Sequence, residues 1–303
     1  MQTKGFIFDL KKFAIHDGPG IRSTVFFKGC PLRCRWCHNP ESMSSAQEVM
    51  VFAQRCLAAC RKCLELCQEK ALTKGEKGIS LNRGRCTACG LCAAACPCEA
   101  LQMAGRVVSV EQVMDDLGKD AVFYQGSGGG VTFSGGEPLA QIDFLQELLL
   151  ASKKHGWHTA VDTCGHAPFA SFEKIMPLVD LFLYDLKIMD PLKHNSFTGE
   201  GNGLILDNLT RLSHSSSSLA IRIPLIPGSN DSQTDIKQLA DFCASLPRVH
   251  HVHLLPYHLG GSGKRKRLDQ ADPLPGTRPP TAAKMQKIKE IFRRRKLTVT
   301  LGG

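Results

Sequence analysis

Three cysteines within eight residues constrain this chain more than any other feature of its sequence. They are Cys30, Cys34 and Cys37 in "GCPLRCRWCHNP", spaced C-x3-C-x2-C. Zinc and iron–sulfur sites usually take four protein ligands, and this loop supplies three. A 4Fe–4S cluster held by three thiolates leaves one iron with an open position. The loop therefore predicts a cluster that binds a small molecule directly.

Eight further cysteines form two runs of four between residues 56 and 96. The second run reads C-x2-C-x2-C-x3-C-P, as in bacterial ferredoxins, where the fourth cysteine of each run ligates the other run's cluster. We therefore expect two more 4Fe–4S clusters with exchanged fourth ligands. One would take Cys56, Cys60, Cys63 and Cys96, and the other Cys67, Cys86, Cys89 and Cys92. Zinc is the alternative, since four-thiolate zinc sites also use C-x2-C pairs.

Short runs of β-branched and aromatic residues predict buried strands, with helical patterns between most of them. The strands are expected at 23–29, 130–137, 158–163, 181–187, 220–226, 251–258 and 297–301, and the helices at 138–156, 232–247 and 281–296. Strand–helix alternation predicts a parallel sheet. The predicted fold is α/β, a partial (β/α)6 TIM-type barrel. Residues 1–50 begin the barrel, 51–105 form an inserted ferredoxin-like domain binding two 4Fe–4S clusters, and 106–303 complete the barrel.

Composition favours a cytoplasmic protein with a sizeable core. Hydrophobic residues make up 43% of the chain. No apolar run reaches the ~18 residues of a membrane span, and the first residues lack the pattern of a signal peptide.

The net charge is +10, of which residues 264–303 carry +9, with twelve Lys and Arg against three acidic residues. Apolar residues at helical spacing within 281–296 favour a docked helix, so we expect no nucleic-acid partner and a monomer.

Polar residues follow the predicted strands at their carboxyl ends, where (β/α) barrels carry their active sites. They are Gly135, Gly136 and Glu137, then Asp162 and Thr163, then Asp185 and Lys187, and finally His258. Asp185 and Lys187 are two residues apart, so a strand would present both on one face. Buried charges are costly unless they bind each other or a ligand. Each group alone is a weak signal, but together with the cysteine loop they predict one binding site.

The cysteine loop resembles the signature of radical S-adenosylmethionine (SAM) enzymes. The longer stretch "DGPGIRSTVFFKGCPLRCRWCHNPE" (17–41) resembles the signature of glycyl radical enzyme activating enzymes, and the likeness runs from "HDGPGIR" to "LLPYH". The insertion resembles that of the larger members. The resemblance implies an anaerobic oxidoreductase whose open iron chelates SAM and cleaves it reductively. The resulting 5′-deoxyadenosyl radical abstracts hydrogen from a glycine of a partner enzyme of the pyruvate formate-lyase-like, dehydratase or lyase type.

The resemblance also implies roles for individual residues. The Gly135–Glu137 segment would bind the amino group of SAM, and Asp17 would touch the substrate glycine loop. Trp36 and His38 flank Cys37 and are counted with the cofactor-binding residues. Further implied contacts to SAM are Asp185, Lys187 and His258, and the implied monovalent-cation site is Asp162, Thr163 and Asp185. The chain departs from many relatives at Arg265, where they carry tyrosine.

The implied electron donor is flavodoxin or ferredoxin. Two alternatives remain open at this point. The chain could be a radical SAM enzyme acting on a small molecule or another peptide. It could also be a non-enzymatic zinc adaptor whose basic tail meets nucleic acid, although that leaves the three-ligand loop unexplained.

Overall fold

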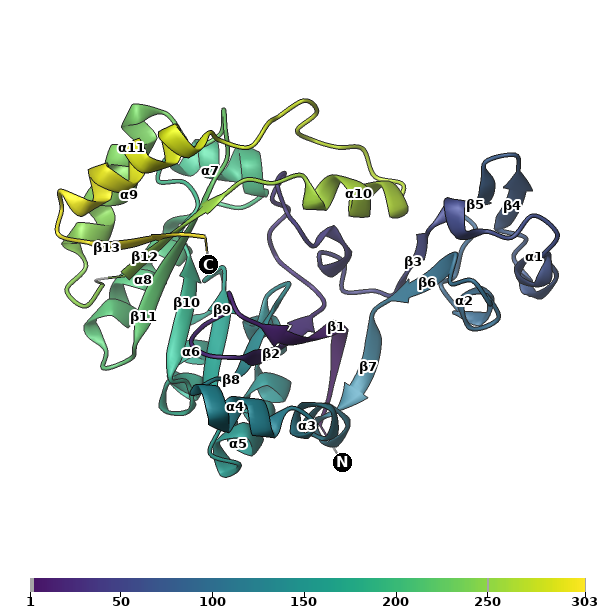
Figure 1. Cartoon of the computed structure of the whole chain (residues 1–303), viewed down its shortest axis with the longest axis horizontal. Coiled ribbons are helices and arrows are strands. Elements are labelled where there is room, and N and C mark those ends of the chain that lie inside the picture. Colours follow the sequence, from purple (N-terminus) through teal and green to yellow (C-terminus); the bar gives the residue numbers. More distant parts are fainter. Residues whose placement is uncertain (1–2, 250, 303) are drawn as a thin grey trace.

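A computed structural model describes residues 3–249 and 251–302. Residues 1–2 of the predicted segment 1–50, and residues 250 and 303 of the predicted segment 106–303, therefore lie outside the described residues. The centre of the structure is a nine-stranded sheet in the order β13-β12-β11-β10-β9-β8-β2-β1-β7 (Figure 1). Seven strands run parallel, and β1 pairs antiparallel with β2 and β7 at one edge. The strands are β1 (Lys4–Ala14), β2 (Arg22–Phe27), β7 (Arg106–Ser109), β8 (Gly130–Gly135), β9 (His158–Thr163), β10 (Leu181–Asp185), β11 (Leu219–Leu225), β12 (His251–Pro256) and β13 (Thr298–Leu301).

All seven predicted strands are present, and they are the seven parallel ones. β1 and β7 were not predicted, because most of β1 and half of β7 are exposed or only half-buried and lack a continuous apolar run. Several strands are shorter than predicted. β8 ends at Gly135, β10 at Asp185 and β12 at Pro256, so Glu137, Lys187 and His258 lie in the segments that follow.

Helices connect the parallel strands and share one hydrophobic core with the sheet. They are α3 (Val110–Gly118), α4 (Ala121–Ser127), α5 (Ile142–Lys154), α6 (Phe169–Ile175), α7 (Pro191–Thr198), α8 (Gly203–His214), α9 (Gln233–Ser245), α10 (Gly260–Arg267) and α11 (Ala282–Arg293), with 3-10 turns η3 (Pro138–Gln141) and η4 (Met176–Leu178). The predicted helix 138–156 therefore begins as a separate 3-10 turn. The docked reading of 281–296 is confirmed, since Met285, Ile288 and Phe292 are buried.

Residues between β3 (Glu48–Val51) and β6 (Leu101–Ala104) project from the sheet as a separate lobe (Figure 1). β3 and β6 pair antiparallel at its base, and the lobe has a small hydrophobic cluster of its own. It contains η2 (Ala53–Arg55), α1 (Lys62–Leu66), β4 (Leu72–Gly75), β5 (Gly78–Leu81) and α2 (Leu91–Ala94). We call it the cysteine lobe.

The topology places the cysteine loop and the polar strand ends together. β2 leads directly into the loop of residues 28–39, which ends at η1 (Pro40–Ser42). Because the seven strands are parallel, their carboxyl ends open on the same end of the sheet. Across the described part of the chain, no helix is long and apolar enough to cross a membrane.

Candidate active site

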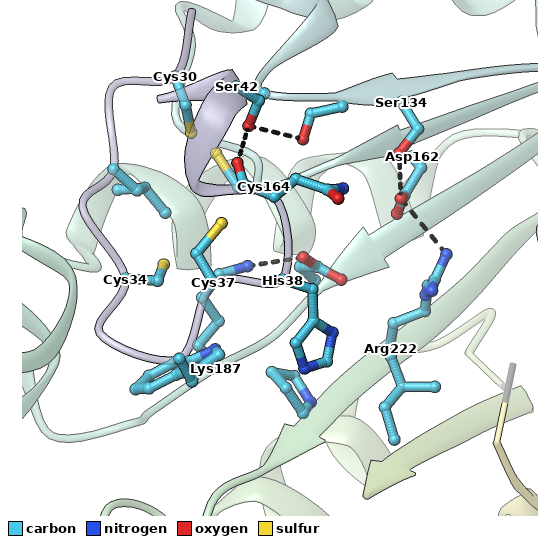
Figure 2. Close-up of a pocket in the computed structure, with 18 of the residues that line it drawn as sticks. Cys30, Cys34, Cys37, His38, Ser42, Ser134, Asp162, Cys164, Lys187 and Arg222 are labelled. Atoms are coloured by element: carbon cyan, nitrogen blue, oxygen red, sulfur yellow. Dashed lines mark hydrogen bonds and ion pairs between the residues drawn. The ribbon is translucent and has the colours of Figure 1, made fainter. Parts of the chain in front are cut away.

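A cavity of about 200 Å³ lies at the carboxyl ends of the parallel strands (Figure 2). One wall is the cysteine loop, and the others come from the ends of β8 to β12. The predicted site residues that line it are Cys30, Cys34, Trp36, Cys37, His38, Gly135, Gly136, Asp162, Thr163, Asp185 and Lys187. Glu137, His258 and Asp17 are not among its lining residues. Residues separated by up to 157 positions therefore meet at one site.

The cysteine loop is fixed by main-chain contacts to the end of α7. The amide of Arg33 donates to the carbonyl of Thr198 at 2.6 Å, and that of Arg35 donates to the carbonyl of Phe197 at 3.0 Å. Within the loop, the Cys37 amide donates to the Cys34 carbonyl at 3.1 Å. These contacts explain how an irregular segment can present three thiols on one side.

Burial sets the chemistry of these thiols. It raises the pKa of Cys37 to about 11 and that of Cys34 further still, because a thiolate loses its hydration there. Three buried thiolates would be stable only beside a compensating cation. Soft thiolate donors suit iron–sulfur clusters, so the residues present fit a cluster bound by three cysteines.

A fourth thiol, that of Cys164, lines the same cavity at the end of β9. A hydrogen bond with Cys164 lowers the pKa of Cys30, while that of Cys164 is raised by the same contact and by burial. The Cys164 amide donates to Glu137 Oε2 at 2.8 Å. Cys164 was not among the predicted site residues, because its position in the cavity depends on how β9 ends.

The two glycines of the Gly135–Glu137 segment let the backbone pass directly against β2 and the loop that follows it. A Cβ on Gly136 would lie 2.2 Å from the Gly29 carbonyl oxygen, and Gly135 has φ of +112°. The Glu137 amide donates to the Gly29 carbonyl at 2.9 Å. The Glu137 side chain turns inward and is fully buried. It accepts hydrogen bonds from the Leu139 amide, the Cys164 amide and the Thr163 hydroxyl, so it ties β8 to β9.

Charged side chains occupy the far side of the cavity. Arg222 Nη1 lies 3.3 Å from Asp162 Oδ2 and 3.7 Å from Asp17 Oδ1, and the Ser134 hydroxyl donates to Asp162 at 2.7 Å (Figure 2). Asp162 Oδ1 and Arg222 Nη1 are buried without a hydrogen-bond partner. Burial raises the pKa of Asp162 to about 6 even though Arg222 opposes the shift. Unsatisfied buried polar atoms of this kind mark a place for a polar ligand.

Lys187 and Asp185 form an ion pair of 2.7 Å between the cysteine loop and Asp162. Burial alone would lower the pKa of Lys187, but Asp185 and the nearby thiols outweigh it and raise the pKa above its usual range. Lys187 is therefore a permanent cation at the cavity wall.

Two histidines cover another side of the site. The rings of His38 and His258 stack with centroids 3.6 Å apart, although His258 is itself exposed. His38 Nε2 is buried without a partner, and burial lowers the His38 pKa to about 4. Trp36 lines the cavity and packs against Phe197, with their ring centroids 6.2 Å apart.

Asp17 and Asp162 both lie close to the same nitrogen of Arg222, Nη1. Asp17 Oδ2 accepts a hydrogen bond from the Thr24 hydroxyl at 2.9 Å. The fully buried Arg22 follows closely and donates to the Thr132 hydroxyl at 2.7 Å and to the carbonyls of Pro19 and Val131. Arg22 was not among the predicted site residues, although it lies in the segment that carries the family resemblance.

The cysteine lobe brings its eight predicted ligands together around two cavities. One, of about 90 Å³, is lined by Cys67, Cys86, Cys89 and Cys92. The other, of about 10 Å³, is lined by Cys56, Cys60, Cys63, Cys96 and Cys98. The fourth cysteine of each run thus lies with the first three of the other run. The amides of Ala71 and Ala100 donate to Cys67 Sγ and Cys96 Sγ at 3.3 and 3.2 Å, an arrangement that suits cluster thiolates.

Comparison with known proteins agrees with this site. A family model described as the radical SAM superfamily matches residues 24–243. The trans-4-hydroxy-L-proline dehydratase activating enzyme of Clostridioides difficile is 41% identical over 98% of this chain and 99% of its own. The isethionate sulfite-lyase activating enzyme of Oleidesulfovibrio alaskensis is 42% identical over 90% of each chain.

Among solved structures, a domain of pyruvate-formate lyase-activating enzyme from Bacteroides vulgatus is 37% identical, with a TM-score of 0.50 over 58% of this chain and 99% of that domain. A radical SAM methyltransferase from Sphaerobacter thermophilus, 15% identical, has a TM-score of 0.53 over 92% of this chain and 66% of its own, and shares the fold alone. A mostly parallel sheet with a three-cysteine loop at its carboxyl end thus defines the class. The chain belongs to the radical SAM superfamily and, within it, to the activating enzymes of glycyl radical enzymes.

Proposed function

We propose that this activating enzyme cleaves SAM at a 4Fe–4S cluster held by Cys30, Cys34 and Cys37 and then oxidises one glycine of its protein substrate. One observation carries the proposal. The three thiols face, across a single cavity, a wall of carboxylates and cations with unpartnered buried polar atoms. SAM carries an amino group, a carboxylate and a sulfonium, and a wall of mixed charge suits all three.

When bound and reduced, the cluster supplies one electron that breaks the S–C5′ bond of SAM, releasing methionine and a 5′-deoxyadenosyl radical that takes a hydrogen atom from the glycine α-carbon. The products are 5′-deoxyadenosine and a glycyl radical. The protein's part is to bind and orient the reactants and to exclude water. Burial of Leu32, Cys34 and Trp36 supports the last of these roles.

The charged residues would orient SAM. We assign the Gly135–Glu137 backbone to its amino group, and Asp185, Lys187 and His258 to further contacts. Lys187 keeps its charge at any physiological pH, so it can pair with the SAM carboxylate. Asp162, Thr163 and Asp185 are proposed to hold a monovalent cation beside it. The cluster has three carboxylates, those of Asp17, Asp162 and Asp185, against the two cations of Lys187 and Arg222, which agrees with this assignment.

Asp17 is proposed to contact the substrate glycine loop. It lies beside Arg222, whose side chain lines the cavity. A loop entering there would reach SAM without displacing the cluster ligands. His38 stays neutral near neutral pH and would offer its unpartnered Nε2 as a hydrogen-bonding group.

The cysteine lobe is proposed as a ferredoxin-like domain, residues 51–105, with two 4Fe–4S clusters. The two cysteine-lined cavities and the amide donors to Cys67 and Cys96 support this assignment. The lobe would take electrons from flavodoxin or ferredoxin and pass them toward the loop cluster. The barrel would then consist of residues 1–50 and 106–303, in a cytoplasmic monomer.

The protein substrate is proposed to be a glycyl radical enzyme of the dehydratase or lyase type. The relatives named above act on a dehydratase and a sulfite-lyase, and others on choline trimethylamine-lyase and benzylsuccinate synthase. Similar identities to several of these classes leave the individual partner open, so the experiment must include a panel.

Anaerobic reconstitution with iron and sulfide, followed by SAM, dithionite and each candidate glycyl radical enzyme, tests the proposal. We expect a glycyl radical signal by electron paramagnetic resonance (EPR) with one candidate, and 5′-deoxyadenosine by chromatography. Deoxyadenosine without a glycyl signal from any candidate would favour a radical SAM enzyme acting on another substrate. If iron-loaded protein forms neither deoxyadenosine nor a glycyl radical, the proposal is overturned.

Two cysteine variants test the three-ligand site. Cys34→Ala should abolish deoxyadenosine formation while the lobe keeps its iron. Cys164→Ala, which removes the other thiol of the cavity, should keep the loop cluster and its perturbation by SAM. Loss of that cluster in Cys164→Ala would mean a four-thiolate site with no open iron.

A further inference from the structure

Helix α10 connects the cysteine loop to the cysteine lobe. At its start, Gly261 packs so closely that a Cβ would lie 2.3 Å from the Cys37 carbonyl oxygen. One turn later, Lys264 donates to Asn39 Oδ1 at 2.7 Å and pairs with Glu41. Both contacts hold the segment that follows Cys37.

Arg265 holds the segment that precedes Cys37. Its side chain is almost fully buried, with 9% of the residue exposed. Nη2 donates to the carbonyl oxygens of Cys34 and Arg35 at 3.1 and 3.4 Å, and Nη1 donates to Gln270 Oε1 at 3.3 Å. A planar guanidinium can serve several acceptors in fixed directions, which an ammonium cannot.

The end of α10 packs on the base of the lobe. Leu268, 1% exposed, forms a small cluster with Met50 and Ala104 of the β3–β6 ladder. The Arg267 guanidinium lies 4.4 Å from the centre of the Phe52 ring, and Arg83 donates to the Arg267 carbonyl at 3.1 Å. Figure 1 shows α10 between the lobe and the end of the sheet. One short helix therefore contacts both the cysteine loop and the base of the cysteine lobe.

We propose that Arg265 is a positioning residue for the cysteine loop, and that its buried positive charge sets the reduction potential of the cluster bound there. This inference rests on the proposed function, since it needs a cluster on Cys30, Cys34 and Cys37. Two roles follow from the contacts. The guanidinium fork, meaning the donors of Arg265 to the carbonyls of Cys34 and Arg35, keeps the Cys34–Cys37 turn in place. Its positive charge acts on the cluster with little screening by water, because Arg265 is buried.

The direction of the electrostatic effect follows from charge. Reduction adds one negative charge to the cluster, and a nearby cation stabilises the reduced state more than the oxidised state. Cluster potentials depend on net charge, hydrogen bonding and burial. Removing the positive charge at 265 therefore shifts the potential to a more negative value. Gln keeps most of the side-chain length without charge, whereas Lys keeps the charge without the fork.

The test uses the full-length, reconstituted protein and EPR-monitored redox titration. The loop cluster is identified as the signal that SAM perturbs, and the lobe clusters serve as internal references. We expect Arg265→Gln to lower the midpoint potential of the loop cluster alone. The Arg265→Lys protein should keep the wild-type midpoint potential. Lys266→Gln, the same charge change at an exposed neighbour on α10, should leave the potential at the wild-type value.

A second measurement tests the positioning role. Arg265→Lys and Arg265→Gln should both lose iron from the loop cluster to a chelator severalfold faster than wild type, with unchanged loss from the lobe. If Arg265→Gln fails to load the loop cluster while the lobe stays loaded, Arg265→Lys decides: iron loss from its loop cluster severalfold faster than wild type supports the positioning role, because this variant keeps the charge and lacks only the guanidinium. If Arg265→Gln fails to fold, the chelator rate of Arg265→Lys decides, and a wild-type rate overturns the proposal.

The outcomes separate this inference from the function beneath it. A fully loaded Arg265→Gln protein with wild-type potential and wild-type iron loss overturns the role of Arg265 alone. An equal shift in Lys266→Gln does the same, because the effect would then be a general one of surface charge. Wild-type protein with no SAM-perturbed cluster overturns the proposed function itself.

Discussion

The hydroxyl of Thr163 lies 2.9 Å from each carboxylate oxygen of Glu137, and this contact joins the ends of β8 and β9 beneath the active-site cavity. Glu137 is fully buried, and burial raises its pKa. The Leu139 and Cys164 amides complete its shell of donors. The side chain therefore holds two strand ends together, directly after Gly135 and Gly136, which line the cavity.

Glu137→Gln should destabilise the protein by about 2–3 kcal/mol, because an amide NH2 would face donors where a carboxylate oxygen accepted them. Thr163→Val keeps the shape of the side chain but removes its hydroxyl donor, and should cost about 1 kcal/mol. Anaerobic urea denaturation measures both. Glu147→Gln, an exposed position on α5, is the matched control and should change stability by less than about 0.5 kcal/mol. A Glu137→Gln protein as stable as the control would contradict the structural role.

The sequence predicted the seven parallel strands because each carries a continuous apolar or β-branched run. It also predicted which cysteines lie together in the lobe, since exchange of the fourth ligand follows from the ferredoxin spacing. The cavity lining was largely predictable too, because carboxyl ends of parallel strands meet at one end of the sheet.

Other features depended on tertiary packing. β1 and β7 are edge strands with exposed faces, so hydrophobic periodicity gives little signal for them. The inward turn of the Glu137 side chain depends on three donors that converge on it, namely the Leu139 amide, the Thr163 hydroxyl and the Cys164 amide. Arg22 and Arg265 are buried cations whose acceptors are main-chain carbonyls, and carbonyl positions cannot be read from residue types.

Arg22→Lys should destabilise the protein by about 3 kcal/mol or more. The Arg22 guanidinium is 0% exposed and donates to the Thr132 hydroxyl and to carbonyls from the loop before β2 and from β8 and β9. A lysine ammonium cannot reach these acceptors together, and it leaves buried carbonyls without a donor. Thermal denaturation under anaerobic conditions measures the loss. Arg33→Lys, whose side chain bonds only local carbonyls of its own loop, is the control and should shift the midpoint far less.

Two pairs of cysteine variants test the exchange of ligands between the runs in the lobe. Cys67→Ser with Cys92→Ser should remove one cluster, about four irons, because both thiols line the same cavity. Cys63→Ser with Cys67→Ser should remove both lobe clusters, about eight irons, because these thiols line different cavities. Iron analysis after anaerobic reconstitution counts the loss. If each run binds its own cluster instead, the two results exchange places, so either pairing gives a distinct answer.

Asp180 gives a pH-dependent contribution to stability away from every iron site. Burial raises its pKa, but hydrogen bonds from Lys153 and from the amide and hydroxyl of Thr159 outweigh this and hold the pKa below its usual range. A carboxyl with a depressed pKa in the folded state stabilises that state above its unfolded pKa, and the gain is lost as pH falls through the folded value.

Asp180→Asn should therefore cost about 1 kcal/mol at pH 7, allowing for the partial exposure of this group. The cost should stay constant from pH 8 to about 5 and shrink below about pH 4, where the unfolded carboxyl begins to take up protons that the folded one excludes. Urea denaturation of both proteins across this range measures the difference. Asp115→Asn, on the exposed face of α3, should show no such dependence. A cost that grows as the pH falls would mean that burial, and not the hydrogen bonds from Lys153 and Thr159, dominates the pKa of Asp180.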